Sequence, residues 1–220
     1  TEADFHMEGR PDLLFSSEVF FALYKTDRET IYQQLFSDGL HSKKSRLTID
    51  GASIADRKIT EFYEDETDWR KVAAPTESEL NEESGATNSL YLIKYREFDP
   101  TASTNGTELY RYMIPLIRLS EVYLLAAEGA PTREEAIGYI NAIRNHRQCR
   151  DLVDENLDLQ NAITKEFARE VIGEGQLFFY YKRHAMEEVY SGTSIEGLKQ
   201  IAPDNYVLRL PKSETDKRVK

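Results

Sequence analysis

The segment from Tyr112 to Arg147 constrains the fold of this chain most, because its apolar residues keep helical spacing on both sides of a tight turn. Residues 112–128 are apolar nearly all round, and we expect a helix of that kind to be buried between other helices. The second part opens with Thr132 and, three residues later, Glu135, a capping-box pair that satisfies unpaired amides of a first helical turn. Its inner stripe consists of Ala136, Ile140 and Ile143. The segment therefore predicts a helical hairpin, a scaffold unit of helical-repeat proteins.

A second pair of helices is predicted after this hairpin. Residues 158–172 keep helical spacing, and Gly173 and Gly175 then end the helix. One stripe of it holds Ile163, Phe167 and Val171. The aromatic-rich residues 177–189 predict the next helix. Two consecutive helix pairs are typical of tetratricopeptide (TPR) solenoids, although the strict 34-residue consensus is absent.

The first half of the sequence is irregular and mixed. The apolar run SEVFFALY at 17–24 predicts a buried strand, and LYLIKYREF at 90–98 alternates like a second strand. Residues 27–38 predict a short helix or a loop. The chain is thus predicted to be mainly α. An irregular α/β-mixed region with a few short strands and ligand-binding loops is predicted over residues 1–108, and a helical TPR-like scaffold with an extended C-terminal segment is predicted over residues 109–220.

Composition excludes several classes of protein. The 220 residues include 28 basic and 39 acidic side chains, and the net charge of −11 argues against a nucleic-acid partner, which needs a basic face. The sequence contains no apolar run long enough to predict a membrane span. The single cysteine, Cys149, excludes an internal disulfide, and it follows a predicted helix end, where the dipole disfavours a thiolate. Because the sequence starts without Met or a signal peptide, we expect it to be a piece of a longer protein.

No motif of catalysis or cofactor binding is found in the sequence. The four histidines are scattered and lack the HExxH spacing of a zinc site. The acidic run of Asp65, Glu66 and Asp68 is expected to be solvated. We therefore predict no catalytic residue, no metal site and no cofactor.

Several segments resemble one known family in their order along the chain. The motifs are RLSEVYLLAAE at 118–128, INAIRNHR at 140–147, ITKEFAREVIGEGQLFFYYKR at 163–183 and LRLPKSE at 208–214. In this order they resemble the SusD/RagB family, outer-membrane nutrient-binding lipoproteins of Bacteroidota. SEVFFALY, ADRKITEF at 55–62 and YLIKYR at 91–96 are also similar to family segments. The resemblance covers most of this chain, but only the C-terminal half of a full-length family member.

The resemblance implies a largely α-helical protein in which TPR-like helix pairs form a scaffold, and a more irregular region on that scaffold helps to bind glycans. It implies an N-terminal lipidated cysteine as the only membrane contact, and this sequence lacks that anchor. It further implies a place at the outer membrane, surface-exposed or facing the periplasm, as a lid on a TonB-dependent transporter. The matched motifs belong to the scaffold, so they carry over no ligand-binding residue.

Candidate ligand-binding residues follow from the chemistry of sugars. Proteins stack aromatic side chains on the apolar faces of sugar rings, while amides and carboxylates bind the hydroxyls. Trp69 is the only tryptophan, and it lies in the polar stretch EDETDWRKV near Tyr63; Tyr91 lies on the next predicted strand. We predict Trp69 and Tyr63 as ligand-binding residues, with Tyr91 third. The alternative is that these three side chains fill a local core.

The sequence thus predicts a non-enzymatic glycan- or nutrient-binding component of a bacterial outer-membrane uptake system. The alternative is a TPR-like protein–protein interaction module that binds no sugar. A hydrolase is a third possibility without a supporting motif. The aromatic run at 178–181 is expected to pack between helices, and Arg169, Glu174 and Arg183 are expected to form ion pairs or helix-end contacts in that packing.

Overall fold

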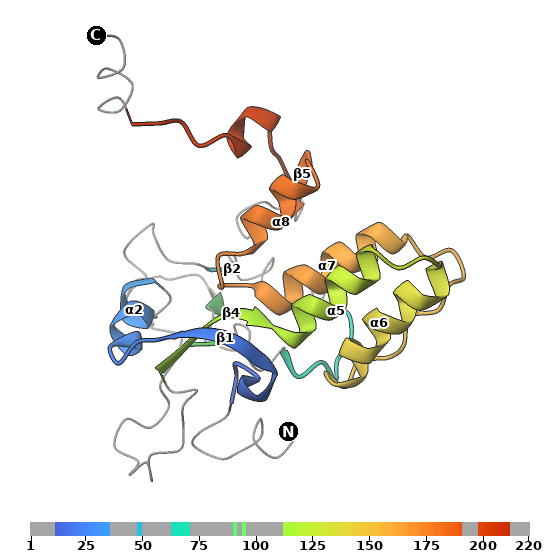
Figure 1. Ribbon diagram of the computed structural model, residues 1–220, viewed down its shortest axis with the longest axis horizontal. Coiled ribbons are helices and arrows are strands. Elements are labelled where there is room, and N and C mark those ends of the chain that lie inside the picture. The colour runs from blue at the N-terminus through green and yellow to red at the C-terminus, as the bar shows by residue number, and fades with distance from the viewer. Residues whose placement is uncertain are drawn as a thin grey trace, which may run out of the picture.

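The computed structural model of the protein describes residues 12–35, 48–49, 63–70, 90–91, 94–95, 112–190 and 198–211 (Figure 1). Its helices are α2 (Arg28–Leu35), α5 (Leu119–Glu128), α6 (Arg133–Asn145), α7 (Leu159–Val171) and α8 (Leu177–Arg183), with 3-10 turns η1 (Ser16–Glu18) and η4 (Pro203–Tyr206). Three antiparallel strand pairs are β1 (Val19–Tyr24) with β4 (Met113–Arg118), β2 (Thr48–Ile49) with β3 (Leu90–Tyr91), and β5 (Glu188–Tyr190) with β6 (Leu198–Gln200). These elements confirm a helix-rich fold with a few short strands.

Helices α5 and α6 form the hairpin that the sequence predicts. The hydroxyl of Thr132 caps α6 by accepting a hydrogen bond from the backbone N–H of Glu135 at 3.2 Å. The contact between the two helices buries Ala127 against Ala136 and Ile140, and Ile163 of α7 completes this cluster. Helix α5 lies against both α6 and α7 (Figure 1). Burial of this apolar surface is the main force that holds the three helices together.

Helix α7 begins and ends where the sequence predicts. The carboxylate of Asp158 accepts a hydrogen bond from the N–H of Asn161 at 3.1 Å and caps the first turn. The helix ends at Val171, and the φ angles of Gly173 and Gly175 are then +77° and +79°. Glycine reaches this left-handed region without the steric cost that a Cβ atom would add. Local chemistry therefore fixes both ends of α7.

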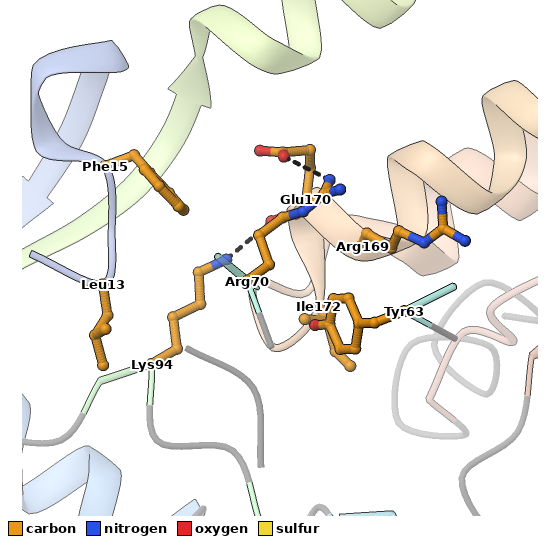
Figure 2. A pocket seen from close by; sticks show the side chains of 8 residues that line it. All are labelled: Leu13, Phe15, Tyr63, Arg70, Lys94, Arg169, Glu170 and Ile172. Atoms are coloured by element: carbon orange, nitrogen blue, oxygen red, sulfur yellow. Dashed lines mark hydrogen bonds and ion pairs between the residues drawn. The ribbon is translucent and has the colours of Figure 1, made fainter. Parts of the chain in front are cut away.

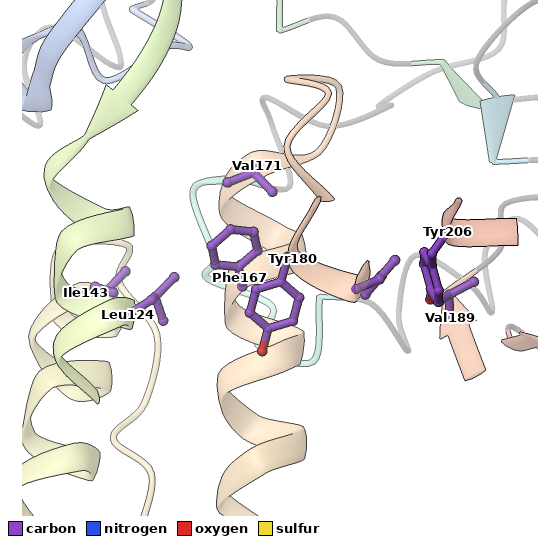
Figure 3. Packing of buried hydrophobic residues seen from close by; sticks show 8 residues of the cluster. Leu124, Ile143, Phe167, Val171, Tyr180, Val189 and Tyr206 are labelled. Atoms are coloured by element: carbon purple, nitrogen blue, oxygen red, sulfur yellow. The ribbon is translucent and has the colours of Figure 1, made fainter. Parts of the chain in front are cut away.

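A second apolar cluster joins the helices to the C-terminal part of the chain (Figure 3). The rings of Phe167 and Tyr180 are stacked with their centroids 4.2 Å apart. The same cluster contains Leu124, Ile143, Val171, Tyr181, Val189 and Tyr206. Within the aromatic run, Tyr180 and Tyr181 are buried as expected, whereas Phe179 is 64% exposed. The predicted helix over 177–189 is wrong beyond Arg183, because the chain turns through Ala185 in a left-handed conformation and then pairs as β5 with β6.

The prediction of a helix from residue 112 is wrong for its first turns. Residues 113–118 form β4, which pairs with β1 over a register from Tyr24 opposite Met113 to Val19 opposite Arg118. Pro115 explains the difference, because proline lacks the N–H of a helix interior and its ring clashes with the preceding turn. In a two-stranded ribbon the missing donor is tolerated at a free strand edge.

Two segments that were expected to be buried are partly exposed. In β1, the side chains of Phe20, Phe21, Leu23 and Tyr24 are 53% to 65% exposed. In α5, the exposed side chains are Leu119, Val122 and Leu125. Helix α5 thus buries only the face that carries Leu124 and Ala127, toward α6 and α7. Apolar composition predicted these elements but not which faces would be covered.

The predicted strand over 90–98 is also longer than the observed one. Strand β3 ends at Tyr91, and Lys94 and Tyr95 lie in a turn, with both side chains buried. The other residues of that stretch lie outside the described part of the chain. The TPR-like arrangement and the division between residues 108 and 109 stay predictions.

Candidate functional site

Helix α7 and the turn after it present three glutamates at intervals of four residues. Glu166, Glu170 and Glu174 have side chains that are 0% to 1% exposed. Residues four apart share one side of a helix, so the carboxylates of Glu166 and Glu170 point the same way. Burial of this much negative charge requires cations within ion-pairing distance.

Cations reach these glutamates from several segments that are distant in sequence. We define the ion cluster as six bases, Arg70, Lys94, Arg118, Arg144, Arg147 and Arg169, and six acids, Glu18, Asp65, Asp68, Glu166, Glu170 and Glu174. All but Glu18 have side chains that are 5% exposed or less. The formal charges balance. Such a cluster joins the irregular part of the chain to the helices through polar contacts.

Arg70 lies at the centre of the ion cluster. Its Nη1 atom is 2.5 Å from Oε1 of Glu166 and 2.8 Å from Oε1 of Glu170. Its Nε and Nη2 atoms donate to the two carboxylate oxygens of Asp68 at 2.9 Å and 2.8 Å. Figure 2 shows Arg70 and Lys94 reaching Glu170 from two different segments; the ammonium of Lys94 donates to the Glu170 carbonyl at 2.9 Å. One guanidinium group thus forms ion pairs with three carboxylates.

The arginines decide the protonation of the buried acids. Burial alone raises the pKa of Glu170, but the charges of Arg147, Arg70 and Arg118 outweigh it and hold the pKa well below its usual range. The pKa of Asp65 is raised by burial and lowered more strongly by Arg150 and Arg144. Both groups are therefore carboxylates at neutral pH. Burial lowers the pKa of Lys94 to about 8, against the opposing charge of Glu174.

The prediction that Asp65, Glu66 and Asp68 form a solvated run is wrong for two of the three. Asp65 and Asp68 are 5% and 3% exposed, and only Glu66 is exposed to solvent. The carboxylates of Asp65 and Asp68 are buried because Arg144, Arg150 and Arg70 neutralise them. Sequence reasoning missed this buried ionic layer, and the four-residue spacing of Glu166, Glu170 and Glu174 is the signal that could have indicated it.

Trp69 lies between two members of the ion cluster in sequence, Asp68 and Arg70. Its side chain is half-buried, and its backbone N–H donates to the carbonyl of Arg147 at 3.1 Å. Nearby, the hydroxyl of Thr67 donates to the carbonyl of Gln148 at 2.5 Å. We define the Trp69 surface as Trp69 with the exposed residues Glu66 and Thr67 of its own segment and Gln148 and Arg150 of the segment that follows α6. Two segments about 80 residues apart in sequence thus meet at this surface.

The family model described as the SusD family matches residues 22–218. This chain belongs to the SusD family. Neither a search of curated proteins nor a search of solved structures gave a match. For this SusD-family protein, membership implies a nutrient- or glycan-binding component of the outer membrane, and such components are typically lipoproteins. No helix in the described part of the chain is both long and apolar enough to span a membrane.

The three sequence-predicted ligand residues of this SusD-family protein lie in different environments. Trp69 is partly exposed, whereas Tyr63 is only 1% exposed and burial raises its pKa above the usual range. Tyr91 lies on β3, and its side chain is outside what the structure describes. Tyr63 therefore presents no ring face to solvent in this structure. All three stay predicted ligand-binding residues.

Tyr63 lines a small, partly open cavity together with Arg70, Lys94 and Ile172 (Figure 2). The cavity volume of about 10 Å³ is enough for about one water molecule and far too small for a sugar ring. Among the described residues, no group of three or more His, Cys, Asp or Glu side chains is arranged to hold a metal ion. This cavity thus has room for a structural water and not for a sugar.

Proposed function

We propose that this SusD-family protein binds an oligosaccharide or a related nutrient without transforming it and presents it to a TonB-dependent outer-membrane transporter. Family membership supports the binding role. The Trp69 surface supports a sugar as the ligand, because it combines the only indole of the chain with exposed carboxylate, hydroxyl, amide and guanidinium groups. An aromatic face flanked by a few polar groups is the usual composition of a sugar site.

The buried ion pairs next to Trp69 are the observation that carries this proposal. Arg70, next to Trp69 in sequence, is 3% exposed and makes ion pairs with three carboxylates. The Trp69 backbone is tied to the segment after α6 through the carbonyl of Arg147. A binding group held in place before the ligand arrives loses little conformational entropy on binding.

The charge state of the cluster argues against glycoside hydrolysis in this part of the chain. A glycosidase needs one carboxyl group that stays protonated as the general acid and a second that acts as nucleophile or base. Arginines hold Glu170 and Asp65 ionised, with pKa values below their usual range. These carboxylates serve as partners of arginines, which fits a binding protein better than a hydrolase.

Isothermal titration against a panel of oligosaccharides tests this function. We expect Trp69→Ala to weaken the sugar affinity by about tenfold, equivalent to ~1.4 kcal/mol, while helicity measured by far-UV circular dichroism stays the same. Phe179→Ala is the matched control, because Phe179 is an aromatic residue that is 64% exposed on α8, outside the Trp69 surface. Unchanged affinity of Trp69→Ala removes Trp69 from the site, and sustained release of reducing sugar contradicts the non-enzymatic role.

A TPR-like interaction module that binds no sugar is the second candidate function. The exposed row of Leu119, Val122 and Leu125 on α5 favours it, since apolar residues at helical spacing on a surface suit a protein partner. If the protein binds no sugar of the panel but still captures the transporter in a pull-down experiment, this alternative is supported. Loss of that capture in Leu125→Glu would assign the contact to α5.

A further inference from the structure

We propose that the ion cluster acts as a clamp that positions the Trp69 surface, with Glu166 as the positioning residue that holds its two segments together. This inference rests on the proposed function, because it explains how the Trp69 surface is kept ready for a ligand. It assigns to Glu166, a buried scaffold residue that touches no ligand, a role in affinity.

Glu166 connects the two segments that form the Trp69 surface. Its Oε1 atom accepts from Nη1 of Arg70 at 2.5 Å, and its Oε2 atom accepts from Nη1 of Arg144 at 3.1 Å. Arg70 follows Trp69 directly in sequence. Arg144 in turn donates through Nη2 to Asp65 at 2.6 Å and through Nε to the carbonyl of Arg150 at 2.8 Å. One carboxylate on α7 therefore holds both sides of the surface.

The segment of residues 63–70 is attached to the helices differently from the way the helices are attached to each other. Helices α5, α6 and α7 share apolar clusters. In the segment, Tyr63 is the buried apolar side chain, and the other buried side chains are the charges of Asp65, Asp68 and Arg70. A change that weakens ion pairs but leaves apolar burial intact should release this segment first, because local opening follows the weakest set of contacts.

The charges around Glu166 show why removing its charge opens the clamp. Three guanidinium groups face this carboxylate: Arg70 from the segment, Arg144 from α6 and Arg169 from α7 itself. Glu170 shares Arg70, and Asp65 shares Arg144. Beyond these, Arg150 and Lys165 pair with Asp65 and Glu64 at the edge of the cluster. Without the Glu166 charge, arginines from two segments face each other with too few counter-charges, which favours separation.

An opened clamp lowers affinity by reducing the fraction of molecules in which the site is assembled. If the assembled state falls to about one molecule in ten, the apparent Kd rises roughly tenfold, although no contact with the ligand has been removed. The helical content of the protein stays the same, because the helices are held together by apolar burial. Loss of affinity without loss of helicity is therefore the signature of the clamp.

The experiment compares Glu166→Gln with the wild-type protein. Because Trp69 is the only tryptophan, its fluorescence and its quenching by acrylamide report on this segment alone. We expect Glu166→Gln to raise the quenching of Trp69. For a sugar that the wild type binds, the affinity should be weakened roughly tenfold. The far-UV circular dichroism spectrum should stay unchanged. Glu128→Gln is the control, because Glu128 accepts from Nη2 of Arg183 at 2.9 Å, outside the cluster. Wild-type quenching and affinity in Glu166→Gln overturn the clamp.

A titration of the wild-type protein with acid keeps the test decisive if Glu166→Gln does not fold. Protonation of Asp65 and Glu170, which pair with arginines of the cluster, should raise Trp69 quenching at a higher pH than the pH at which helicity is lost. Coincidence of the two transitions overturns the clamp. Fluorescence needs no ligand, so a wild type that binds no sugar contradicts the proposed function, while the quenching result still decides on the clamp.

Discussion

Arg147 and Glu170 form a buried, two-pronged ion pair: Nε of Arg147 lies 3.0 Å from Oε1 of Glu170, and Nη2 lies 3.1 Å from Oε2. The same guanidinium donates to both carboxylate oxygens of Glu18 in η1, at 2.8 Å and 2.7 Å, and lies 3.8 Å from the ring centroid of Phe15. A single arginine thus connects the start of the described chain to α7. Planar guanidinium geometry makes this double pairing possible, which a lysine could not reproduce.

Replacement of Glu170 should strongly destabilise the protein. Glu170→Ala leaves Arg147, Arg70 and Arg118 without their shared counter-charge in the interior. We expect the free energy of unfolding in urea to fall by about 3–5 kcal/mol, the usual cost of removing one partner of a buried ion pair. Glu155→Ala, at an exposed glutamate, should change stability by less than about 0.5 kcal/mol. Similar losses in the two variants would contradict a stabilising role for the cluster.

Stability should fall in acid because of Glu170 and Asp65. Their folded-state pKa values lie below the ordinary values of 4.5 and 3.8, so the unfolded chain binds their protons more readily. The stabilisation is complete above those ordinary values and is lost as the pH falls through the lower folded-state values. Urea midpoints should stay level from about pH 7 to about pH 5 and should then decrease between about pH 5 and about pH 3. Asp65→Asn should show a shallower decrease, and an equal slope in both proteins would exclude Asp65 as a contributor.

The thiol of Cys149 should be unreactive in the native protein. Its side chain is buried, and burial raises its pKa from 9.0 to about 12, although Nη2 of Arg70 lies 3.6 Å from the sulfur and opposes that rise. At about pH 8 the thiolate fraction falls on the order of a thousandfold, so reaction with a disulfide reagent should slow by at least that factor. Unfolding in urea should restore the ordinary rate. A fast reaction in the native state would show that Cys149 is accessible.

The stacked pair of Phe167 and Tyr180 should contribute strongly to the attachment of α8 to α7. Phe167→Ala removes a ring that is 4% exposed from the cluster of Figure 3 and should cost about 3–5 kcal/mol in urea unfolding. Phe179→Ala, at the exposed neighbour on α8, should cost less than about 0.5 kcal/mol. A small loss in Phe167→Ala would mean that the cluster repacks around the missing ring.

Local sequence chemistry predicted the helices that carry their own start and stop signals. Thr132 and Asp158 cap α6 and α7 through bonds to amides only three residues away, and Gly173 provides the left-handed turn after α7. Such interactions are complete within a few residues, so the sequence shows them directly. The ordered motifs also led to the SusD family, which the match over residues 22–218 confirms.

The sequence by itself determined helices α6 and α7, the family and the presence of an aromatic residue in a polar segment. The tertiary structure decided that residues 113–118 pair as a strand, that Asp65 and Asp68 are buried, and that Tyr63 lies inside while Trp69 reaches the surface. The physical reason is distance along the chain: Arg70 and Glu166 are 96 positions apart, and β1 pairs with a strand about 90 residues later. A charged side chain is buried only where an oppositely charged partner lies within ion-pairing distance, and the tertiary structure decides which distant residues form such pairs.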